Sequence, residues 1–425
     1  MKLSILKIAG LIGLSVLATL AGVNLMSDDE KEIRRKVEHK YSVADPQFLR
    51  TMGALLGPPL VAGNRAETLL NGDQIFPAML SAIRAAKRTI TFETYIYWSG
   101  SVGKEFAEAL SERARAGVRV HILIDWVGSQ KMEEALLDQM RQSGVEIHKY
   151  HPLRGYTIDR INNRTHRKLL VVDGVVGFTG GVGIADEWSG NAQDPDHWRD
   201  THYRIEGPAV AHMQAAFMDN WMKVSGTVRD GEAYFPVIEA NGPHTAQMFQ
   251  SSSQGGAESM HLMYLLSVAA AKESIDLAMA YFVPDEIALE ALVAALRRGV
   301  RVRIIMPGPI TDANLVRRAS RALWGSILEA GAELYEYEPT MYHCKVLVVD
   351  GLWVSVGSTN FDARSFRLND EANLNIYDRE FALRQIADFE NDLKRSRRIT
   401  YEEWANRPWT EKAWERLWAL FRSQL

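Results

Sequence analysis

One short chemical motif occurs twice in this chain of 425 residues. In the first copy His166 is followed two positions later by Lys168, and in the second copy His343 is followed by Lys345. If each motif forms a β-strand, the alternation of side chains places its histidine and lysine on the same face. Two such strands brought together would form a cationic pocket in which one imidazole attacks a bound phosphate and the other protonates the leaving group. The motif therefore predicts phosphoryl transfer without a metal.

Each copy of the motif ends in an aspartate followed by glycine, Asp173 in the first copy and Asp350 in the second. As members of the motif, both aspartates are counted among the candidate catalytic residues. An aspartate beside a glycine is also typical of a turn, in which its side chain holds loop backbone by hydrogen bonds. We favour this structural role for both residues.

The segments around the two motifs are repeated as well. The strand-like run from Lys87 corresponds to the run from Lys272, and the run from Arg115 corresponds to the run from Arg297. The spacing between matched segments stays nearly constant along the chain, as it does when two equivalent units differ only by short loop insertions. The repetition therefore indicates that whole domains are duplicated.

Within each half, apolar strand-like runs alternate with alanine-rich segments of helical period, such as 103–116 and 286–298. This order implies α/β layers with a mixed or largely parallel sheet. The predicted fold is therefore α/β, with two tandem domains over residues 61–235 and 245–400 related by a pseudo-two-fold axis. We expect the active site at their interface, with one histidine and one lysine from each domain.

On these residues the chain resembles the phospholipase D superfamily and, within it, the bacterial cardiolipin synthases. The resemblance covers about residues 60–400 and is strongest in the second half, where the sequence G-S-T-N ends at Asn360 and is followed by Glu371. It implies that Ser358 and Asn360 belong to the phosphate-binding sequence and that Glu371 orients a histidine. In the first half Gly183 stands where Asn360 stands in the second, so one phosphate-binding amide is missing.

Two further acidic residues are candidates for the substrate-binding pocket. Asp200 occupies the place that Glu371 holds in the second half, and we expect it to be the partner of one catalytic histidine. Glu93 ends a strand-like run and matches the apolar Ala278 of the other half. It could border the pocket, or it could be an exposed surface carboxylate.

The resemblance implies a transfer in two steps. One histidine attacks phosphorus to form a phosphatidyl-histidine, and the other protonates the departing alcohol and then activates the incoming one. We assign His166 as the nucleophile and His343 as the acid and base, although the sequence makes them nearly equivalent. The lysines stabilise the charge on the phosphate oxygens. No cofactor is expected, and the remaining histidines lack metal-ligand spacing, so no metal site is predicted.

The leading function implied by the resemblance is the transfer of a phosphatidyl group from one phosphatidylglycerol to another, with release of glycerol. The alternative is a hydrolase, either a phospholipase D or, less favoured, a nucleic-acid phosphodiesterase. The formal net charge of −4 does not support a nucleic-acid partner. A membrane scaffold with a lapsed site is suggested only by Gly183 and is opposed by the intact His and Lys pairs.

The beginning of the chain predicts a membrane anchor. Residues 8–26 are uncharged and mostly apolar, and they just suffice to span a bilayer, which needs about 20 residues. We interpret residues 1–30 as an N-terminal transmembrane helix, with a cleaved signal peptide as the alternative, and residues 31–60 as a linker helix. We therefore expect the protein at the cell membrane, with phospholipid as its partner; the membrane face is left open.

The end of the chain predicts an amphipathic C-terminal helix over residues 401–425. Its apolar side carries Trp414, Leu417, Trp418, Phe421 and Leu425. Such a helix can dock on the protein's own core, but the tryptophans just upstream and the basic cluster at 394–398 favour contact with an anionic membrane surface.

Overall fold

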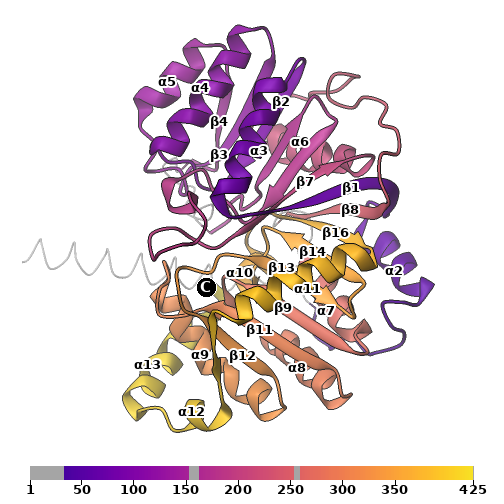
Figure 1. Cartoon of the computed structure of the whole chain (residues 1–425), viewed down its shortest axis with the longest axis vertical. Coiled ribbons are helices and arrows are strands. Elements are labelled where there is room, and N and C mark those ends of the chain that lie inside the picture. The colour runs from indigo at the N-terminus through magenta and orange to yellow at the C-terminus, as the bar shows by residue number, and fades with distance from the viewer. Residues whose placement is uncertain (1–32, 153–161, 253–258, 425) are drawn as a thin grey trace, which may run out of the picture.

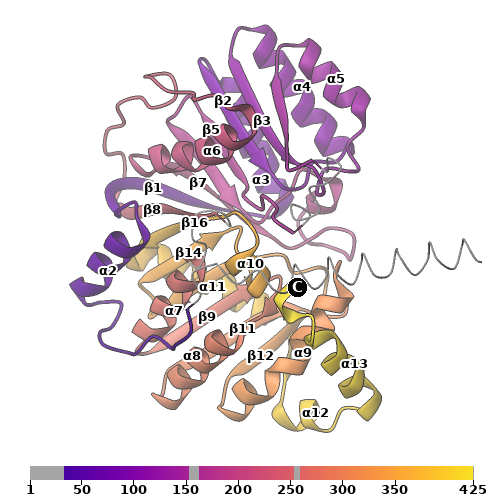
Figure 2. The same cartoon turned by 180° about the vertical axis from the view of Figure 1, so that it is seen from behind.

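The structure, a computed structural model, describes residues 33–152, 162–252 and 259–424. The predicted N-terminal anchor over residues 1–30 lies outside the described residues. Among the residues that are described, no helix combines the length and the apolar character needed to cross a bilayer. Figures 1 and 2 show two similar α/β halves, the first above the second, that meet along the edges of strands β1 and β8.

The first half consists of strands that alternate with helices and then of an antiparallel return. Its elements are β1 (Val61–Leu70), α3 (Asn71–Ala85), β2 (Thr89–Thr94), α4 (Ser101–Arg115), β3 (Arg119–Asp125), α5 (Glu134–Gln142), β4 (Glu146–Tyr150), β5 (Leu169–Val172), β6 (Val176–Gly180), η2 (Asp186–Trp188), β7 (Thr201–Glu206) and α6 (Ala209–Ser225). The helix α4 ends before Gly117, whose positive φ of 90° suits a residue without a side chain.

The second half repeats this order. Its elements are β8 (His244–Ser251), α7 (Ser259–Ala270), β9 (Ser274–Met279), β10 (Phe282–Val283), α8 (Glu286–Arg297), β11 (Arg301–Pro307), α9 (Asn314–Glu329), β12 (Glu333–Tyr337), β13 (Lys345–Val349), β14 (Trp353–Gly357), β15 (Phe361–Asp362), α10 (Ala363–Arg367), β16 (Glu371–Tyr377), α11 (Arg379–Leu393) and β17 (Ser396–Ile399). Like α4, α8 ends before a glycine of positive φ, Gly299.

All but two of the described strands form one mixed sheet with an internal two-fold pattern. Its order is β17-β12-β11-β9-β13-β14-β16-β8-β1-β7-β6-β5-β2-β3-β4. Read outward from the central β8–β1 pair, the two halves list equivalent strands in the same sequence, with β17 added at one edge. The parallel pairs join β2, β3 and β4 in the first half and β9, β11 and β12 in the second. The arrangement agrees with a duplicated α/β unit.

The strands that follow the two His and Lys motifs are buried on both faces. Along β5, Leu170 and Val172 face the apolar core of the first half, whereas Leu169 and Val171 face a core that the two halves share. The equivalent strand β13 contributes Val346 and Val348 to the same shared core. Burial on both sides fixes each strand, and thereby the motif at its beginning.

The segments outside the two halves differ from the expected helices. Only α2 (Pro46–Leu56) is helical in the described part of the predicted linker helix. The segment expected as one helix over 401–425 is divided into α12 (Tyr401–Ala405), α13 (Trp409–Ala419) and the short turn η3 (Arg422–Gln424). The division falls at Pro408, which has no backbone N–H to continue the first helix.

Candidate active site

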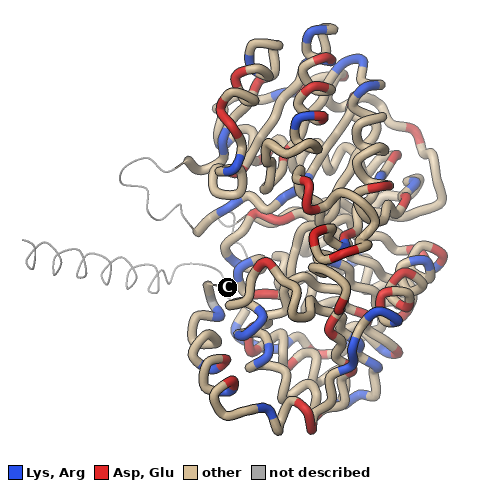
Figure 3. Tube along the Cα trace, turned by 60° about the vertical axis from the view of Figure 1, so that its left-hand side comes forward, with Lys and Arg blue, Asp and Glu red and all other residues tan. Residues whose placement is uncertain are grey.

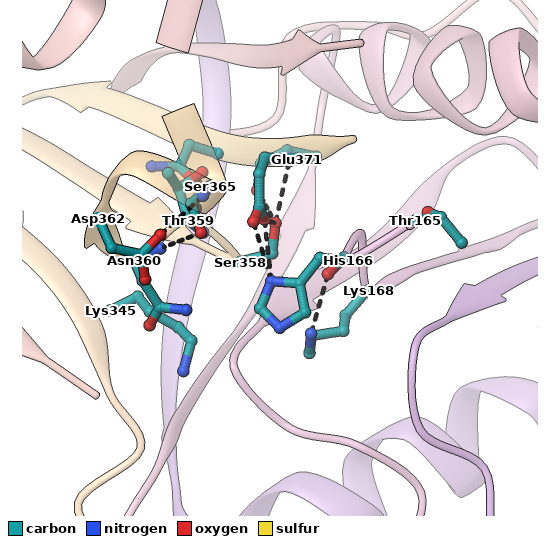
Figure 4. Close-up of polar contacts among 12 residues, drawn as sticks. Thr165, His166, Lys168, Lys345, Ser358, Thr359, Asn360, Asp362, Ser365 and Glu371 are labelled. Carbon is teal, nitrogen blue, oxygen red and sulfur yellow. Dashed lines mark hydrogen bonds and ion pairs between the residues drawn. The ribbon is translucent and has the colours of Figure 1, made fainter. Parts of the chain in front are cut away.

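The two motifs meet at one pocket between the halves. The pocket has a volume of about 650 Å³. Its lining includes Tyr95, Trp98, Lys131, His166, Lys168, Trp188 and Trp198 from the first half and Tyr281, Asp312, His343, Asn360, Asp362 and Arg364 from the second. Figure 4 shows His166 facing Lys345 and Asn360, with Lys168 beside it and Glu371 behind it. Both histidines are nearly fully buried.

Each motif is held in place by the backbone of the other half. The backbone N–H of His166 donates to the carbonyl oxygen of Asp370 at 2.9 Å, and that of His343 donates to the carbonyl oxygen of Arg199 at 2.8 Å. Both contacts belong to short parallel bridges outside the main strands. The chain therefore positions each histidine from two sides, by its own strand and by the opposite half.

The acidic partners of the histidines are exchanged between the halves. Nδ1 of His166 lies 3.0 Å from a carboxylate oxygen of Glu371, which belongs to the second half. Nδ1 of His343 lies 2.7 Å from Oδ2 of Asp200, which belongs to the first half. In both pairs the carboxylate accepts from Nδ1–H, so that Nε2 is the nitrogen left for the substrate. The sequence predicted that Glu371 and Asp200 would each pair with a histidine. It did not reveal that each acid pairs with the histidine of the opposite half.

Both carboxylates remain ionised although they are fully buried. Burial alone acts to raise the pKa of Glu371 and of Asp200. The neighbouring imidazole, its hydrogen bond and a lysine outweigh this effect, so the pKa of each carboxyl lies below its usual value. An ionised carboxylate at Nδ1 stabilises the positive charge that the imidazole gains during the reaction.

Both histidines are neutral in the ligand-free site. Burial lowers the pKa of His166 to about 4, although Glu371 opposes the effect. Burial and the charge of Lys345 also lower the pKa of His343. Nζ of Lys345 lies 3.1 Å from Nδ1 and 3.2 Å from Nε2 of His343, whereas no described residue hydrogen-bonds to Nε2 of His166. The attacking position on His166 is therefore the more open of the two.

The lysines place positive charge where a phosphate would lie. Nζ of Lys168 donates to the carbonyl oxygen of His166 at 2.8 Å, and Nζ of Lys345 donates to that of His343 at 2.7 Å. Burial and the nearby charge of Lys345 lower the pKa of Lys168 to about 7. Burial also lowers the pKa of Lys345. Two ammonium groups held this close together favour an anion between them.

Glu371 and Asp200 accept hydrogen bonds from different donors. This difference explains why the first half has a glycine where the second half has Ser358. In the second half the hydroxyl of Ser358 donates to Glu371 at 2.5 Å. In the first half the equivalent position is Gly181, where a Cβ atom would lie 2.2 Å from Oδ1 of Asp200. The indole N–H of Trp188 donates to Asp200 at 2.8 Å in place of a serine hydroxyl. Trp188 was not identified from the sequence, because nothing in its spacing links it to Asp200.

Ile96 and Trp188 together leave no room for a side chain at Gly183, where the second half has Asn360. A Cβ atom there would lie 2.8 Å from Ile96 and 3.2 Å from the Trp188 ring. The ring of Trp188 packs edge-on against His343, with ring centres 5.3 Å apart. The first half thus has no amide at this position, and the wall beside His343 is aromatic.

The opposite wall of the pocket is polar. Asn360 lines it, and its buried side-chain oxygen has no hydrogen-bond partner among the described residues. Asp362 lies beside it, and burial raises its pKa to about 7. No described residue accepts a hydrogen bond from the side-chain NH2 group of Asn360 either, so this group can donate to a bound phosphate, as the resemblance to the phosphate-binding sequence leads us to expect.

Asp173 and Asp350 do not line the pocket and are removed from the catalytic candidates. Asp173 accepts hydrogen bonds from the backbone N–H groups of residues 87–89, and Asp350 does the same for residues 272–274. Both have left-handed backbone conformations, with φ of 54° and 51°. Asp173 follows β5 and Asp350 follows β13, at the ends of these strands away from the histidines. Each aspartate connects its strand to the loop that precedes the neighbouring strand, β2 or β9.

Glu93 is neither exposed nor part of the pocket lining. It is fully buried, and it accepts hydrogen bonds from Thr165 Oγ1 at 2.5 Å and from Asn220 Nδ2 at 2.8 Å. Burial raises its pKa to about 7. Because Thr165 directly precedes His166, Glu93 supports the motif from behind. Within the described ranges, no group of three or more His, Cys, Asp or Glu side chains could hold a metal ion.

Comparison with known proteins places this site in a family context. The family model described as "Cardiolipin synthase, PLD-like domain" matches residues 79–221 and 265–393, which include both motifs. A cardiolipin synthase of Geobacillus kaustophilus is 36% identical over 353 residues, which cover 82% of this chain and 70% of that protein. Cardiolipin synthase 2 of Bacillus anthracis is 34% identical over 386 residues, covering 89% of this chain and 73% of the relative.

A solved structure shares the fold at low sequence identity. The phosphatidylserine synthase of Haemophilus influenzae superposes with a TM-score of 0.67 and 16% identity, covering 89% of this chain and all of that one. At this identity the likeness concerns the fold alone. It supports the two-unit α/β architecture independently of the sequence repeats.

Proposed function

This chain belongs to the phospholipase D-like family of cardiolipin synthases, and on that premise we propose that it transfers a phosphatidyl group between two phosphatidylglycerol molecules. The products would be cardiolipin and glycerol. The observation that carries the proposal is the pairing of each histidine with a buried carboxylate of the opposite half, at 3.0 Å and 2.7 Å. This pairing leaves the Nε2 atoms of both histidines for the substrate in one pocket, which Lys168 also lines, and Lys345 lies beside His343.

In the first step, Nε2 of His166 attacks phosphorus and a P–N bond forms. The P–O bond to glycerol breaks, and His343 gives its proton to the departing oxygen. His343 takes up this proton from solvent when the substrate binds, because a bound phosphodiester anion favours the imidazolium form. Lys168, Lys345 and Asn360 stabilise the charge on the non-bridging oxygens.

In the second step, the hydroxyl group of the second phosphatidylglycerol attacks phosphorus. His343, now neutral, takes the proton of that hydroxyl, and the P–N bond to His166 breaks. His166 returns to its neutral form and His343 to its protonated form, so the cycle closes. We assign the nucleophile to His166 because its Nε2 is unobstructed, whereas Lys345 lies at hydrogen-bond distance from Nε2 of His343.

The proposal is tested by the identity of the lipid product. The purified full chain is incubated with labelled phosphatidylglycerol, beside His166→Ala and His343→Ala. We expect cardiolipin and glycerol in equal amounts from the wild type and from neither variant. Phosphatidic acid as the sole product would make water the acceptor and the protein a phospholipase D. Product formation by both variants would reject the two-histidine site.

We also propose that the protein is held at a membrane by residues 1–30. The support is the uncharged apolar run at 8–26 and the insolubility in water of the proposed substrate. The test is extraction of membranes that contain the full chain. An anchored protein resists alkaline carbonate and is released by detergent, whereas release by carbonate would reject the anchor.

A further inference from the structure

The C-terminal segment exposes an unusual density of apolar side chains. Five of the fourteen strongly exposed large apolar residues in the described part of the chain fall within residues 409–421. They are Trp409, Trp414, Leu417, Leu420 and Phe421, which we call the C-terminal apolar face. Trp409 is 78% exposed and Leu420 is 76% exposed. At 100° per residue these positions occupy one side of α13 and of the turn that follows it.

The side of α13 that faces the protein is charged. Glu415 is only 2% exposed, and its carboxylate pairs with Arg407 at 2.6 Å and with Arg321 of α9 at 3.3 Å. Glu411 pairs with the same Arg321 at 3.4 Å. An amphipathic helix normally buries its apolar side and exposes its charges. Here α13 packs along α9 through these ion pairs, and the C-terminal apolar face points outward.

The C-terminal apolar face leads to the rim of the active-site pocket. Trp404 donates to the carbonyl oxygen of Arg321 in the middle of α9, and α13 then runs back along this helix toward its first turn. Val316 in that turn lines the pocket. Gln424, just beyond α13, also lines the pocket, and its carbonyl oxygen accepts from Arg364 at 3.1 Å.

We propose that the C-terminal apolar face docks on the surface of a phospholipid bilayer and sets the mouth of the pocket against it. Tryptophan, leucine and phenylalanine on one side of a helix suit the boundary between headgroups and acyl chains. Basic side chains accompany them: Arg416 and Arg422 lie in the same segment, and Figure 3 shows Lys and Arg close to the C-terminal end. They match the negative charge of an anionic lipid surface.

This inference rests on the proposed function, because only a lipid substrate requires a pocket that opens toward a bilayer. The substrate headgroup must reach the histidines while the acyl chains stay in an apolar phase. When the C-terminal apolar face is docked beside the mouth of the pocket, the headgroup has a shorter distance to the histidines and the acyl chains stay out of water. The same geometry gives no advantage to an enzyme whose substrate diffuses freely.

The docking is tested by a fluorescent probe that reports its surroundings. The chain has a single cysteine, Cys344, which is buried, so a cysteine placed at position 420 can be labelled selectively. The probe, attached to full-length Leu420→Cys, should shift to shorter wavelength and brighten when phosphatidylglycerol vesicles are added. The matched control is Leu383→Cys on α11, where the native side chain is 54% exposed. Its spectrum should not change.

Vesicle binding without a shift at position 420 would overturn the inference, because the protein would then be held only by other parts of the chain. An equal shift at positions 420 and 383 would overturn it as well. The experiment needs no turnover, so its result stays separate from that of the product assay. Failure to make cardiolipin would reject the proposed function without altering the fluorescence result.

A second experiment separates docking from chemistry. The double variant Leu420→Asp, Phe421→Asp is assayed with phosphatidylglycerol in vesicles and in mixed detergent micelles. We expect at least about a tenfold loss of rate on vesicles, because two charges would enter the headgroup boundary, and a rate close to wild type in micelles. Leu383→Asp should behave like wild type in both. Equal losses of the double variant in vesicles and micelles would assign the face a purely structural role.

Discussion

The carboxylate of Glu371 lies 3.0 Å from Nδ1 of His166, although the two residues are separated by 205 positions and belong to different halves. Asp200 and His343 make the reciprocal contact at 2.7 Å. Neither half therefore contains a complete pairing of histidine and acid. The active site exists only where the two halves meet, which ties catalysis to the interface and its shared core.

The crossed pairing predicts a large effect of Glu371→Gln on turnover. The amide keeps the shape of the side chain but loses the charge that stabilises the His166 imidazolium. We expect kcat to fall about 10²–10⁴-fold with little change in Tm, as when a carboxylate behind a catalytic histidine is replaced by an amide. Steady-state kinetics and a thermal melt of the same preparation measure both quantities.

Glu336→Gln is the control for this loss. Glu336 is also buried and accepts from Arg397 at 3.0 Å, but it lies outside the pocket lining. This variant should keep its kcat. A similar fall of kcat in both variants would mean that loss of a buried charge, and not of the histidine partner, is responsible.

The indole of Trp188 predicts a smaller, specific effect. Trp188→Phe keeps an aromatic ring against His343 but removes the N–H that donates to Asp200 at 2.8 Å. We expect kcat to fall about 10- to 100-fold with KM nearly unchanged, because one charge-assisted hydrogen bond is worth about 1.5–3 kcal/mol. Trp221→Phe is the matched control, since Trp221 is equally buried and its N–H has no hydrogen-bond partner among the described residues. An unchanged kcat in Trp188→Phe would contradict the positioning role.

The sequence predicted the members of the site better than their pairing. The two His and Lys pairs were identified because strand alternation links residues two positions apart. Glu371 was proposed through the resemblance and Asp200 through its equivalent place in the repeat, but their exchange depends on how the halves pack, which no local pattern records. Trp188 was missed for the same reason.

The less accurate expectations concern burial. Glu93 could not be assigned, because a carboxyl group at a strand end is equally consistent with exposure and with the buried contacts to Thr165 and Asn220. The C-terminal segment has the amphipathic pattern that was expected, but the pattern does not say which side faces the protein. That orientation is decided by the ion pairs of Glu415 with Arg321 and Arg407.

The lowered pKa of Lys168 predicts how activity depends on pH. Its pKa of about 7 in the ligand-free protein means that the ammonium is present below that pH and is lost above it. Because the ammonium binds phosphate, kcat/KM should fall further as the pH rises above about 7, in addition to the fall at lower pH caused by deprotonation of His343, whose pKa is lowered by burial. The pH profile of kcat should show the fall caused by Lys168, its alkaline limb, at higher pH, because bound phosphate favours the charged lysine.

Lys168→Arg distinguishes Lys168 from His343 as the origin of this limb. Arginine stays charged throughout the range, so the further fall in kcat/KM above about pH 7 should disappear, although the overall rate will be lower because the longer side chain fits less well. The measurement is a pH profile of kcat/KM from pH 5 to 9 for both proteins. An alkaline limb at the same pH in the variant would assign it to His343.

The turn aspartates predict a loss of stability without a loss of catalysis. Asp350→Ala removes the acceptor of three backbone N–H groups, at 2.9, 2.8 and 2.9 Å. We expect the free energy of unfolding to fall by about 2 kcal/mol or more, measured by urea denaturation, with kcat unchanged well below the unfolding temperature. Asp378→Ala, which removes a single contact to the N–H of Phe381, should cost less. A fall in kcat at unchanged stability would return Asp350 to the catalytic residues.

The most direct test of the composite site is to locate the covalent intermediate. The full chain is mixed with phosphatidylglycerol, denatured within one turnover at neutral pH, digested and examined by mass spectrometry. We predict a phosphatidyl group on His166, absent when His166 is replaced by alanine, and no adduct on His343. A phosphatidyl group on His343 would reverse the proposed roles, and cardiolipin formation without any histidine adduct would contradict the account of the site.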